Sequence, residues 1–334
     1  MKNFVVAVVG GTGAVGREML NTLERRKFPI SSLRVMASSR SAGTKIQFKG
    51  EEIVIEDLER ADFEGVDFAL FSAGSNVSKA HAHRVVEAGA VVIDNSSAFR
   101  YDADVPLVVP EVNPKAAFKH KGIIANPNCS TIQMVVALKP LHDRATINRV
   151  IVSTYQSVSG AGQKGIWELW KGVKAKVNEE PEPKPSTFAH PMAFEVLPHI
   201  DTFLESAYTR EEEKLTKETR KIIGIPKLQV SATCVRVPVM SAHSESITLD
   251  FDLPISADEA RRILRESPGI KVYDDPKSNI YPLARLAENT DDTWVGRIRN
   301  DFDRPNTLHL WVVADNLRKG AALNAVQIAE LLTK

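Results

Sequence analysis

The chain has 334 residues, with 43 basic and 42 acidic side chains and a formal net charge of +1. This length suits roughly two domains with large apolar cores, and the balanced charge gives no reason to expect nucleic acid or an anionic membrane as a partner. The two cysteines, Cys129 and Cys234, make a disulfide framework improbable and indicate a reducing, cytoplasmic setting.

The first third of the chain alternates short apolar runs with helical patterns. Such alternation predicts right-handed βαβ units and a parallel sheet. The first run, 4–9, is too short for the apolar core of a signal peptide and lacks a small-residue cleavage site, and no run approaches the ~20 residues of a membrane span. Strands are expected at 4–9, 33–37, 66–72, 90–94 and 122–125, and helices at 15–26, 76–88 and 131–143.

After about residue 148, long β-rich stretches appear, separated by helices. This pattern predicts an α+β domain with a mixed or antiparallel sheet. The Pro-rich, charged segment 178–186 is expected to form an exposed loop. β-rich stretches lie at 149–154, 228–239, 246–253 and 307–314, and helices are expected at 161–177, 209–223, 256–266 and 319–332.

A glycine-rich turn, Gly10-Gly-Thr-Gly-Ala-Val-Gly16, follows the first expected strand and opens a helix. Glycines permit a tight turn and close approach of the backbone to a pyrophosphate, and the helix N-terminus adds free N–H groups. The alternative is a purely structural turn, but the strand–turn–helix context favours a dinucleotide site. The N-terminal domain is therefore predicted to be of the Rossmann type.

The segment after the second expected strand, Ser38-Ser-Arg-Ser-Ala-Gly43, bears on the choice of cofactor. An NAD site normally has an Asp or Glu here for the ribose hydroxyls. No acidic residue occurs between Glu24 and Glu51. Ser39, Arg40 and Ser41 instead offer donors to a 2′-phosphate, so NADP is favoured over NAD. The alternative for Arg40 is a solvated loop cation.

Cys129 lies in Asn126-Pro-Asn-Cys-Ser-Thr131, between an expected strand and an apolar helix. A cysteine at a helix N-terminus has a lowered pKa, which raises the thiolate fraction at neutral pH. A structural thiol would more often lie inside an apolar run, as Cys234 does. Cys129 is therefore the expected nucleophile. Together with a dinucleotide fold, it indicates attack on an acyl carbon followed by hydride transfer.

Three further residues fit this chemistry. His243 follows a long strand among small polar residues and suits proton transfer near neutral pH; a surface histidine at a strand end is the alternative. Arg236 offers a bidentate fork for a carboxylate. Arg100 follows the carboxyl end of a strand, where open α/β sheets bind ligands, and is a phosphate candidate. The sequence lacks HExxH and CxxC patterns, so no metal is expected.

The segment Glu211-Glu-Glu-Lys214 opens an expected helix. Acidic residues in a first helical turn interact favourably with the helix dipole, and a lysine there is usually solvated. From the residues alone, this structural interpretation is favoured over a role in a site.

Together these motifs resemble the aspartate-β-semialdehyde dehydrogenase family, most closely its bacterial type. The matching segments follow the family's order along nearly the whole chain. Beside the glycine-rich turn they are Ser38–Gly43, Asp94–Arg100, Asn126–Thr131, Thr154–Gly160, Val235–Glu245 and Asp315–Asn324.

The resemblance implies a role for each matching residue. Cys129 is the nucleophile, His243 the acid/base and Gln156 the group that positions the substrate. Substrate or phosphate is held by Arg236 (α-carboxylate), Glu211 (amino group), Arg100, Lys214 and Asn128. The residues that surround NADP are Gly10, Thr12, Gly13, Ala14, Val15, Arg40, Ser41, Ser159, Gly160 and Asn316.

The implied activity is NADPH-dependent reduction of 4-phospho-L-aspartate to L-aspartate 4-semialdehyde and phosphate, on the route to diaminopimelate, lysine, threonine and methionine. The resemblance also implies a homodimer. An NADP-binding domain would comprise 1–128 and 316–334, and a catalytic and dimerisation domain 129–315. Alternatives are an N-acetyl-glutamyl-phosphate reductase, a more distant glyceraldehyde-3-phosphate dehydrogenase and a non-catalytic NADP-binding paralogue.

Overall fold

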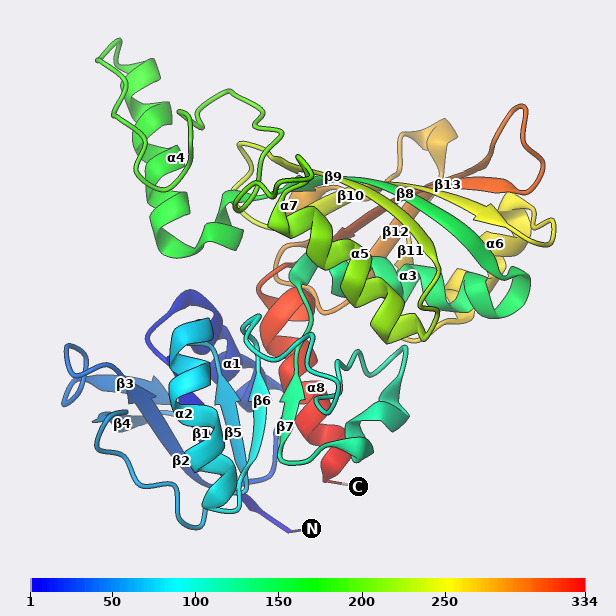
Figure 1. Cartoon of the computed structure of the whole chain (residues 1–334). Coiled ribbons are helices and arrows are strands. Elements are labelled where there is room, and N and C mark those ends of the chain that lie inside the picture. Colours follow the sequence, from blue (N-terminus) through cyan, green and yellow to red (C-terminus); the bar gives the residue numbers. More distant parts are fainter. Residues whose placement is uncertain (1, 334) are drawn as a thin grey trace. The chain divides into compact units, whose positions relative to one another are not determined.

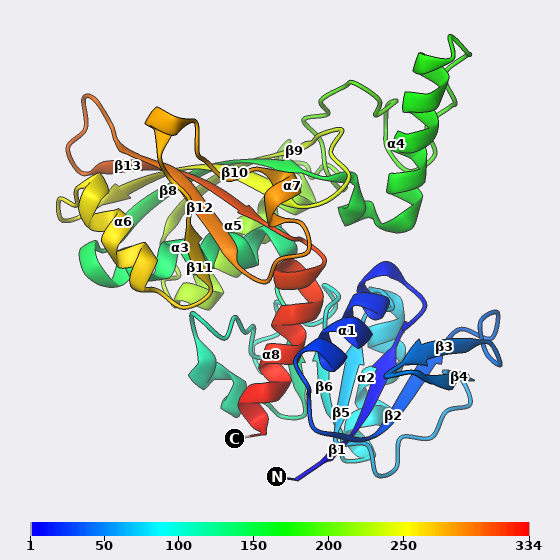
Figure 2. The same ribbon diagram turned by 180° about the vertical axis from the view of Figure 1, so that it is seen from behind.

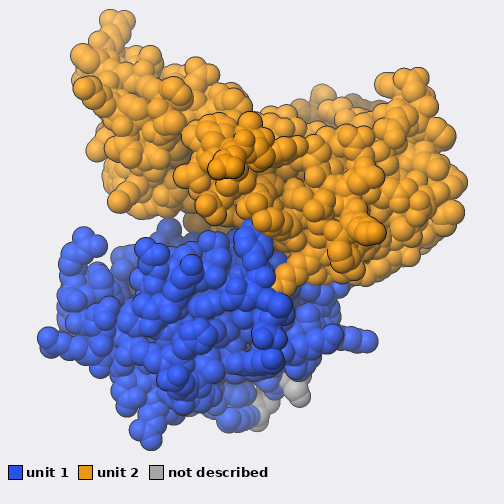
Figure 3. Space-filling model, viewed as in Figure 1, with its two compact units in different colours: residues 1–128, 321–334 blue, residues 129–320 orange. Residues whose placement is uncertain are grey.

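The computed structural model describes residues 2–333, which divide into two compact units. The first contains the chain up to Asn128 and again from Ala321, and the second runs from Cys129 to Gly320; Figure 3 colours them separately. We expected the return to the first unit at residue 316. Residues 316–320 belong to the second unit instead, and Asn316 is held there because its Oδ1 accepts a hydrogen bond from the Ala242 N–H at 3.0 Å.

The first unit contains a seven-stranded sheet in the order β3-β4-β2-β1-β5-β6-β7 (Figure 1). All neighbouring strands are parallel except β3 and β4, which form an antiparallel pair. The strands are β1 (Phe4–Val9), β2 (Ile30–Ala37), β3 (Lys45–Phe48), β4 (Glu51–Asp57), β5 (Phe68–Phe71), β6 (Val91–Asp94) and β7 (Ile123–Ala125).

Helices cover both faces of this sheet, because alternate residues of a strand point to opposite sides. Val6 and Val8 of β1 pack in one core with α1 (Ala14–Arg25) and α8 (Leu323–Leu332). The intervening Ala7 and Val9 pack in a second core with α2 (Ser75–Glu87). A short 3-10 helix, η1 (Pro114–Lys119), precedes β7. The predicted Rossmann-type, doubly wound architecture is confirmed.

The second unit contains a six-stranded mixed sheet in the order β11-β12-β13-β10-β8-β9 (Figure 2). Strands β8 and β9 are parallel, as are β11 and β12, and the other neighbours are antiparallel. The predicted mixed sheet is confirmed. Its strands are β8 (Ile147–Gln156), β9 (Gln229–Arg236), β10 (His243–Phe251), β11 (Ile270–Val272), β12 (Thr293–Asn300) and β13 (Thr307–Ala314).

One face of this sheet is covered by α3 (Cys129–Ala145), α5 (Arg210–Ile223) and α6 (Ala257–Glu266), whose apolar residues share a core with the strands. Along β8 the residues of the opposite face are half-buried, and Tyr155 contacts Trp311 of β13 with ring centroids 5.4 Å apart. Short elements complete the unit: η2 (Val158–Ala161), η3 (Pro276–Ser278) and α7 (Ala284–Ala287). The π-helical turn η4 (Arg318–Ala322) begins in the second unit, ends in the first and continues into α8.

Helix α4 (Gly162–Val177) follows η2 and packs on a small apolar cluster that includes Leu169, Met192 and Leu197. The segment 178–186 after it is a mostly exposed loop, as predicted. Within residues 2–333, none of the helices combines the length and the apolar character needed to cross a membrane.

The predicted strands and helices are present within a few residues of their expected bounds, but four strands were not predicted. These are the hairpin strands β3 and β4 of the first unit and the strands β11 and β12 of the second. The hairpin is rich in charged residues, and β11 is only three residues long, so neither has a marked strand pattern.

Candidate active site

The glycine-rich turn lies where the strand order reverses, since β2 flanks β1 on one side and β5 on the other. Ligands of open α/β sheets bind at such a switch point. Gly10 has φ +84°, and a Cβ there would lie 2.9 Å from the carbonyl carbon of Ser72, just after β5. A Cβ on Gly16 would lie 2.2 Å from the Gly10 oxygen. The turn therefore fits a backbone cradle for a pyrophosphate.

The other predicted cofactor residues of this turn surround the start of α1. Gly13 precedes the helix and Ala14 is its first residue, with no acidic residue in the first turn to oppose an anion. Thr12 accepts a hydrogen bond from Arg17 Nε through its carbonyl oxygen, at 3.2 Å. Val15 packs against the core of α1 and α8.

The loop after β2 exposes Arg40, whereas Ser41 is half-buried and accepts the Thr44 hydroxyl through its carbonyl oxygen at 2.6 Å. Strand β4, which was not predicted, places two acidic residues, Glu56 and Asp57, beside the end of β2. Both have partners: Glu56 accepts from Arg34 Nε at 2.9 Å, and Asp57 accepts from the Glu59 N–H at 3.2 Å.

Arg100 and Asn128 also lie in the first unit, and both are buried. Arg100 donates through Nη2 to the carbonyl oxygen of Asn95 at 2.9 Å. The loop that carries it is fixed by Asp94, which accepts hydrogen bonds from Ser78 and Ser96, each at 2.7 Å. The arginine is therefore held at the carboxyl end of β6, as its sequence position predicted.

The second unit brings the remaining predicted site residues together at one edge of its sheet. Strands β8 and β9 run parallel, and their last residues, Gln156 and Arg236, are register partners. Because β10 is antiparallel to β8, it starts at the same edge with His243. Gln156 therefore meets Arg236 and His243, which follow it by 80 and 87 positions, at one end of the sheet.

Cys129 is the first residue of α3 and is half-buried. A Cβ built on Gly320 would lie 2.8 Å from the Cβ of Cys129, so the turn at residue 320 packs directly against the nucleophile candidate. The Cys129 thiol also raises the pKa of Arg236, although burial lowers it more strongly. Cys129 and Arg236 are therefore close enough to interact electrostatically.

His243 is completely buried, so the alternative of a surface histidine is wrong. Its Nδ1 accepts a hydrogen bond from the backbone N–H of Ser157 at 3.1 Å. Burial, and then the charge of Arg236, lower the pKa of His243 to about 3, so the ring is neutral. A backbone N–H can only donate, so the proton of the neutral ring lies on Nε2.

The guanidinium of Arg236 is also buried and donates through Nη1 to the carbonyl oxygen of Ser157 at 2.6 Å. Gly160 leaves room for this arrangement. A Cβ at that position would lie 2.8 Å from Arg236 Nη1 and 3.2 Å from His243 Nε2. Gly160 thus lines the space in front of both side chains.

Glu211 and Glu212 have different roles, which the sequence alone did not separate. Thr209 and Glu212 form the capping box of α5: the Thr209 N–H donates to Glu212 Oε2 at 2.7 Å, and the Glu212 N–H to Thr209 Oγ1 at 3.3 Å. Glu211 is buried, and its Oε1 accepts from Gln156 Nε2 at 3.2 Å. Capping is therefore supplied by Glu212, which leaves Glu211 directed at Gln156.

Gln156 is held on both sides, because its Oε1 also accepts the Thr154 hydroxyl at 3.0 Å. Lys214 Nζ donates to Glu211 at 2.9 Å and to Asp201 at 2.7 Å. Burial alone would lower the pKa of Lys214, but Glu211 and Asp201 raise it, and the net pKa is higher than usual. The lysine is therefore an ammonium between two carboxylates and not a solvated side chain.

Ser159 and Asn316, predicted to contact the cofactor, are buried and bonded to each other. Asn316 Oδ1 accepts from the hydroxyls of Ser159 at 3.1 Å and Ser157 at 3.2 Å. Ser157 is the residue of this site that the sequence did not single out. Its backbone N–H and carbonyl oxygen make the main contacts, and any residue type has these groups, so the sequence could not identify Ser157 by its side chain. Only its position between Gln156 and Ser159 indicated that it lies in the site.

Cys234 is buried in the apolar core of the second unit, and burial raises the pKa of its thiol. Cys129 and Cys234 are not joined in a disulfide. No group of three or more His, Cys, Asp or Glu side chains within residues 2–333 is arranged to hold a metal ion.

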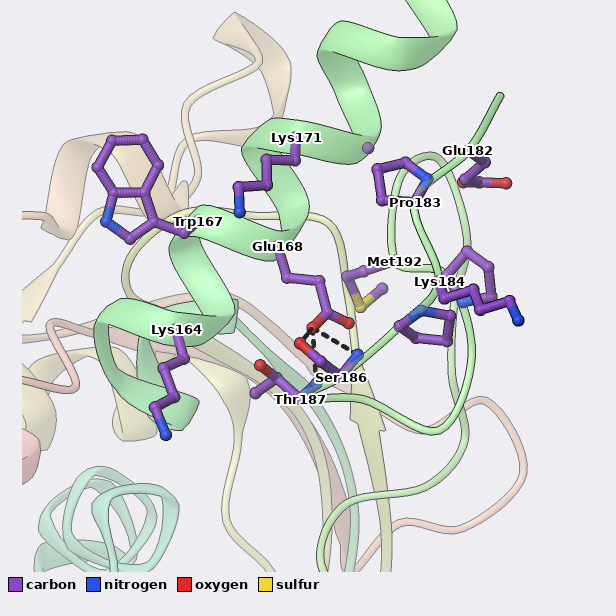
Figure 4. A pocket seen from close by; sticks show the side chains of 13 residues that line it. Lys164, Trp167, Glu168, Lys171, Glu182, Pro183, Lys184, Ser186, Thr187 and Met192 are labelled. Carbon is purple, nitrogen blue, oxygen red and sulfur yellow. Dashed lines mark hydrogen bonds between the residues drawn. The ribbon is translucent and has the colours of Figure 1, made fainter. Parts of the chain in front are cut away.

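A cavity of about 450 Å³ lies between α4 and the loop that follows it, away from the residues described above (Figure 4). Glu168 points into this region and accepts hydrogen bonds from Ser186 Oγ at 2.9 Å and the Thr187 N–H at 2.6 Å. Glu168 thus fastens the Pro-rich loop to α4. The cavity contains none of the predicted site residues, and size alone does not make it the active site.

Two family models match the chain: the NAD binding domain of semialdehyde dehydrogenases over residues 5–120, and their dimerisation domain over residues 138–319. An aspartate-semialdehyde dehydrogenase of Aquifex aeolicus is 55% identical over 332 residues, covering 98% of this chain and 98% of the relative. The chain belongs to the aspartate-semialdehyde dehydrogenase family. It is therefore an oxidoreductase with a nicotinamide-nucleotide-binding domain, as its sequence motifs predicted.

Solved structures agree with this assignment. Aspartate semialdehyde dehydrogenase II of Vibrio cholerae, complexed with ASA, is 47% identical with a TM-score of 0.97, covering 100% of this chain and 99% of that chain. The Candida albicans enzyme with NADP is 27% identical with a TM-score of 0.76, covering 99% of each chain. The alternative of a more distant dehydrogenase is not supported by these matches.

Gly320→Ala should lower kcat about tenfold or more, because a new Cβ 2.8 Å from that of Cys129 must displace the thiol, and small misplacements of reacting groups are costly. Gly172→Ala is a matched control, since its Cβ would lie 2.9 Å from the Ala193 Cβ within the α4 region. Both variants should be compared by steady-state kinetics and melting temperature. Equal kcat for the two would show that the contact at Gly320 is irrelevant to catalysis.

Proposed function

We propose that the chain catalyses the reversible, NADPH-dependent reduction of 4-phospho-L-aspartate to L-aspartate 4-semialdehyde and phosphate through a thioester on Cys129. The observation that carries this proposal is the convergence of side chains from five elements at one edge of the second sheet. These residues are Cys129, Gln156, Glu211, Arg236 and His243. Family membership and the relative that was solved with ASA support the choice of substrate.

In the first step, the Cys129 sulfur attacks the acyl carbon of the substrate. A C–S bond forms, the C–O bond to phosphate breaks, and the thiol proton ends on the released phosphate. Cys129 suits this step because it begins a helix, where N–H groups without helical partners can stabilise negative charge on the sulfur and on the acyl oxygen.

A bound NADPH would supply the hydride that reduces the thioester carbon. His243 is the proposed acid/base: its Nε2–H donates a hydrogen bond to the oxyanion at that carbon, which collapses to the aldehyde as the C–S bond breaks. The aldehyde leaves, and the Cys129 thiolate takes up a proton from solvent, which restores the thiol. The neutral ring with its proton on Nε2 is the form that can donate to the oxyanion.

The substrate offers three charged groups. We assign its α-carboxylate to the fork of Arg236 and its ammonium to Glu211, which carries negative charge next to Gln156. Phosphate is assigned to Arg100 and Lys214, and Asn128 to the substrate. Lys214 uses two of its three ammonium N–H donors on Asp201 and Glu211, which leaves the third for phosphate.

We assign NADP to the first unit. The turn from Gly10 to Val15 would hold the pyrophosphate, and Arg40 with Ser41 the 2′-phosphate. Glu56, near the end of β2, is occupied by the guanidinium of Arg34, and Asp57 accepts the Glu59 N–H, whereas Arg40 in the loop after β2 is exposed and can meet a phosphate. A relative solved with NADP agrees with this choice. From the second unit, Ser159, Gly160 and Asn316 are assigned to the nicotinamide end.

We also propose that two copies associate through the second unit, to which the dimerisation-domain model matches. The half-buried face of its sheet, with Tyr155 and Trp311, is the expected contact. The product aldehyde would serve the synthesis of diaminopimelate, lysine, threonine and methionine.

Phosphate-dependent reduction of NADP⁺ by L-aspartate 4-semialdehyde tests the activity itself. Cys129→Ser should lose nearly all turnover while its melting temperature and its binding of NADPH persist, because a hydroxyl is a far weaker nucleophile than a thiolate. Cys234→Ala is the control and should remain active, since Cys234 lies in the core. Turnover of Cys129→Ser near the wild-type rate would rule out the thioester.

Arg40→Ala should raise the KM for NADPH with little effect on that for NADH, because only NADPH carries the 2′-phosphate. Losing one charge-assisted hydrogen bond costs about 1.5–3 kcal/mol, or roughly ten- to a hundredfold in affinity. Kinetics with both cofactors measure the effect. An unchanged NADPH/NADH preference would mean that Arg40 is only a solvated loop residue.

Three Glu→Gln variants separate capping from substrate recognition. Glu211→Gln should lower kcat/KM for aspartate semialdehyde by roughly a hundredfold, because a shift of ~1 Å in the acyl carbon has that effect, and NADPH affinity should persist. Glu212→Gln should leave kcat/KM and stability close to wild type, since a glutamine at this position can also complete the capping box. Glu213, which pairs with Lys217 on the surface, is the neutral control.

If all three variants have equal, near-wild-type kcat/KM, Glu211 does not belong to the site. In that case, the main reason to prefer a substrate with a free amine over an N-acetylated one is lost.

A further inference from the structure

Glu245 is a buried acid that the proposed reaction does not use. It is the third residue of β10, is 0% exposed, and pairs in the sheet with Thr154 and Val312. Neither of its carboxyl oxygens has a hydrogen-bond partner within residues 2–333. Since alternate residues of a strand share a face, Glu245 points to the same side of the sheet as His243.

Gln133 lies on that side, one helical turn after Cys129 in α3, and is also 0% exposed. Its Nε2 donates to the backbone carbonyl oxygen of His243 at 3.3 Å. Its Oε1, like the Glu245 carboxyl, has no partner within the described residues. Gln133 therefore already joins the helix of the nucleophile to the strand of the acid/base, but only half of its carboxamide is fixed.

We propose that Glu245 is a positioning residue: it carries a proton, donates that O–H to Oε1 of Gln133, and thereby holds the carboxamide that ties the backbone of His243 to the helix of Cys129. This inference rests on the roles proposed above for Cys129 and His243. It adds a residue that touches neither substrate nor cofactor but sets the geometry between nucleophile and acid/base.

The protonated state is the one that satisfies both groups. An ionised carboxylate and a carboxamide oxygen are both acceptors, so their contact would leave a buried charge unpaired, which is costly. Burial raises the pKa of Glu245 well above its usual range, and the nearby Gln133 side chain offsets part of this effect, so the two side chains lie close to each other. A neutral Glu245 has one donor, and Oε1 of Gln133 is an acceptor without a partner.

The orientation of the carboxamide follows from this bond. Rotation of Gln133 by 180° would turn its oxygen toward the His243 carbonyl oxygen and its NH₂ group toward Glu245. A protonated Glu245 disfavours this rotated state, because its O–H group would then face the NH₂ group of Gln133, and both groups are donors. The bond thus selects the orientation in which Nε2 holds β10.

Three variants test this role. Glu245→Gln keeps a neutral donor of the same shape and should retain kcat within about twofold of wild type. Glu245→Leu removes the donor and should lower kcat about tenfold, with KM values for aspartate semialdehyde and NADP⁺ nearly unchanged, because only the reacting groups are displaced. The double variant Gln133→Leu/Glu245→Leu should regain the melting temperature lost by Glu245→Leu, since both polar groups are removed together, but its kcat should remain low.

Wild-type kcat in Glu245→Leu, or in the double variant, would overturn the proposal, as would a Glu245→Gln variant as slow as Glu245→Leu. The double variant supplies the test if Glu245→Leu does not fold. Cys129→Ser and His243→Asn are assayed in parallel. If they are inactive while Glu245→Leu is fully active, only the positioning role fails. If they remain active, the proposed mechanism itself fails.

Discussion

The backbone of Ser157 holds His243 and Arg236 together, and the arrangement of the candidate site in the second unit depends on it. Its N–H donates to Nδ1 of His243 at 3.1 Å, and its carbonyl oxygen accepts from Arg236 at 2.6 Å. Because these are main-chain groups at a fixed spacing, the imidazole and the guanidinium cannot move independently. The N–H also forces the proton of the neutral imidazole onto Nε2, the nitrogen assigned to the reacting oxygen.

The sheet of the second unit makes this convergence possible. Its parallel pair β8 and β9 ends at the edge where antiparallel β10 begins, so Gln156, Arg236 and His243 meet there. Close packing around them leaves space only for small residues. Gly160 faces Arg236 and His243, and Gly320 faces Cys129. Polar groups that are fixed in this way need not reorganise during the reaction.

The sequence predicted best what is local. The glycine-rich turn after β1 and the cysteine at the start of α3 are each read from a few consecutive residues, and the structure has the expected strand–turn–helix context at both. The family resemblance extended this prediction to distant residues such as Gln156 and His243, which no spacing along the chain brings together.

Features that depend on tertiary structure could not be predicted from the residues alone. Which of three consecutive acids caps α5 depends on the phase of the helix: Glu212 caps, whereas Glu211 points to Gln156. The burial of His243 and the contact of Gly320 with Cys129 arise from pairing between distant segments. Ser157 acts through its backbone, so its side chain gives no signal.

The state of the His243 ring tests this arrangement most directly. Its pKa of about 3 lies below the ordinary 6.5, so the neutral form stabilises the fold fully above pH 6.5, and this stabilisation is lost as the pH falls from 6.5 through 3. Nitrogen NMR of ¹⁵N-labelled histidine rings, assigned with the His243→Asn variant, reports the tautomer and its titration. We predict a neutral ring with its proton on Nε2 from about pH 5 to pH 8. A proton on Nδ1, or titration near pH 6.5, would contradict the role of the Ser157 N–H in the site.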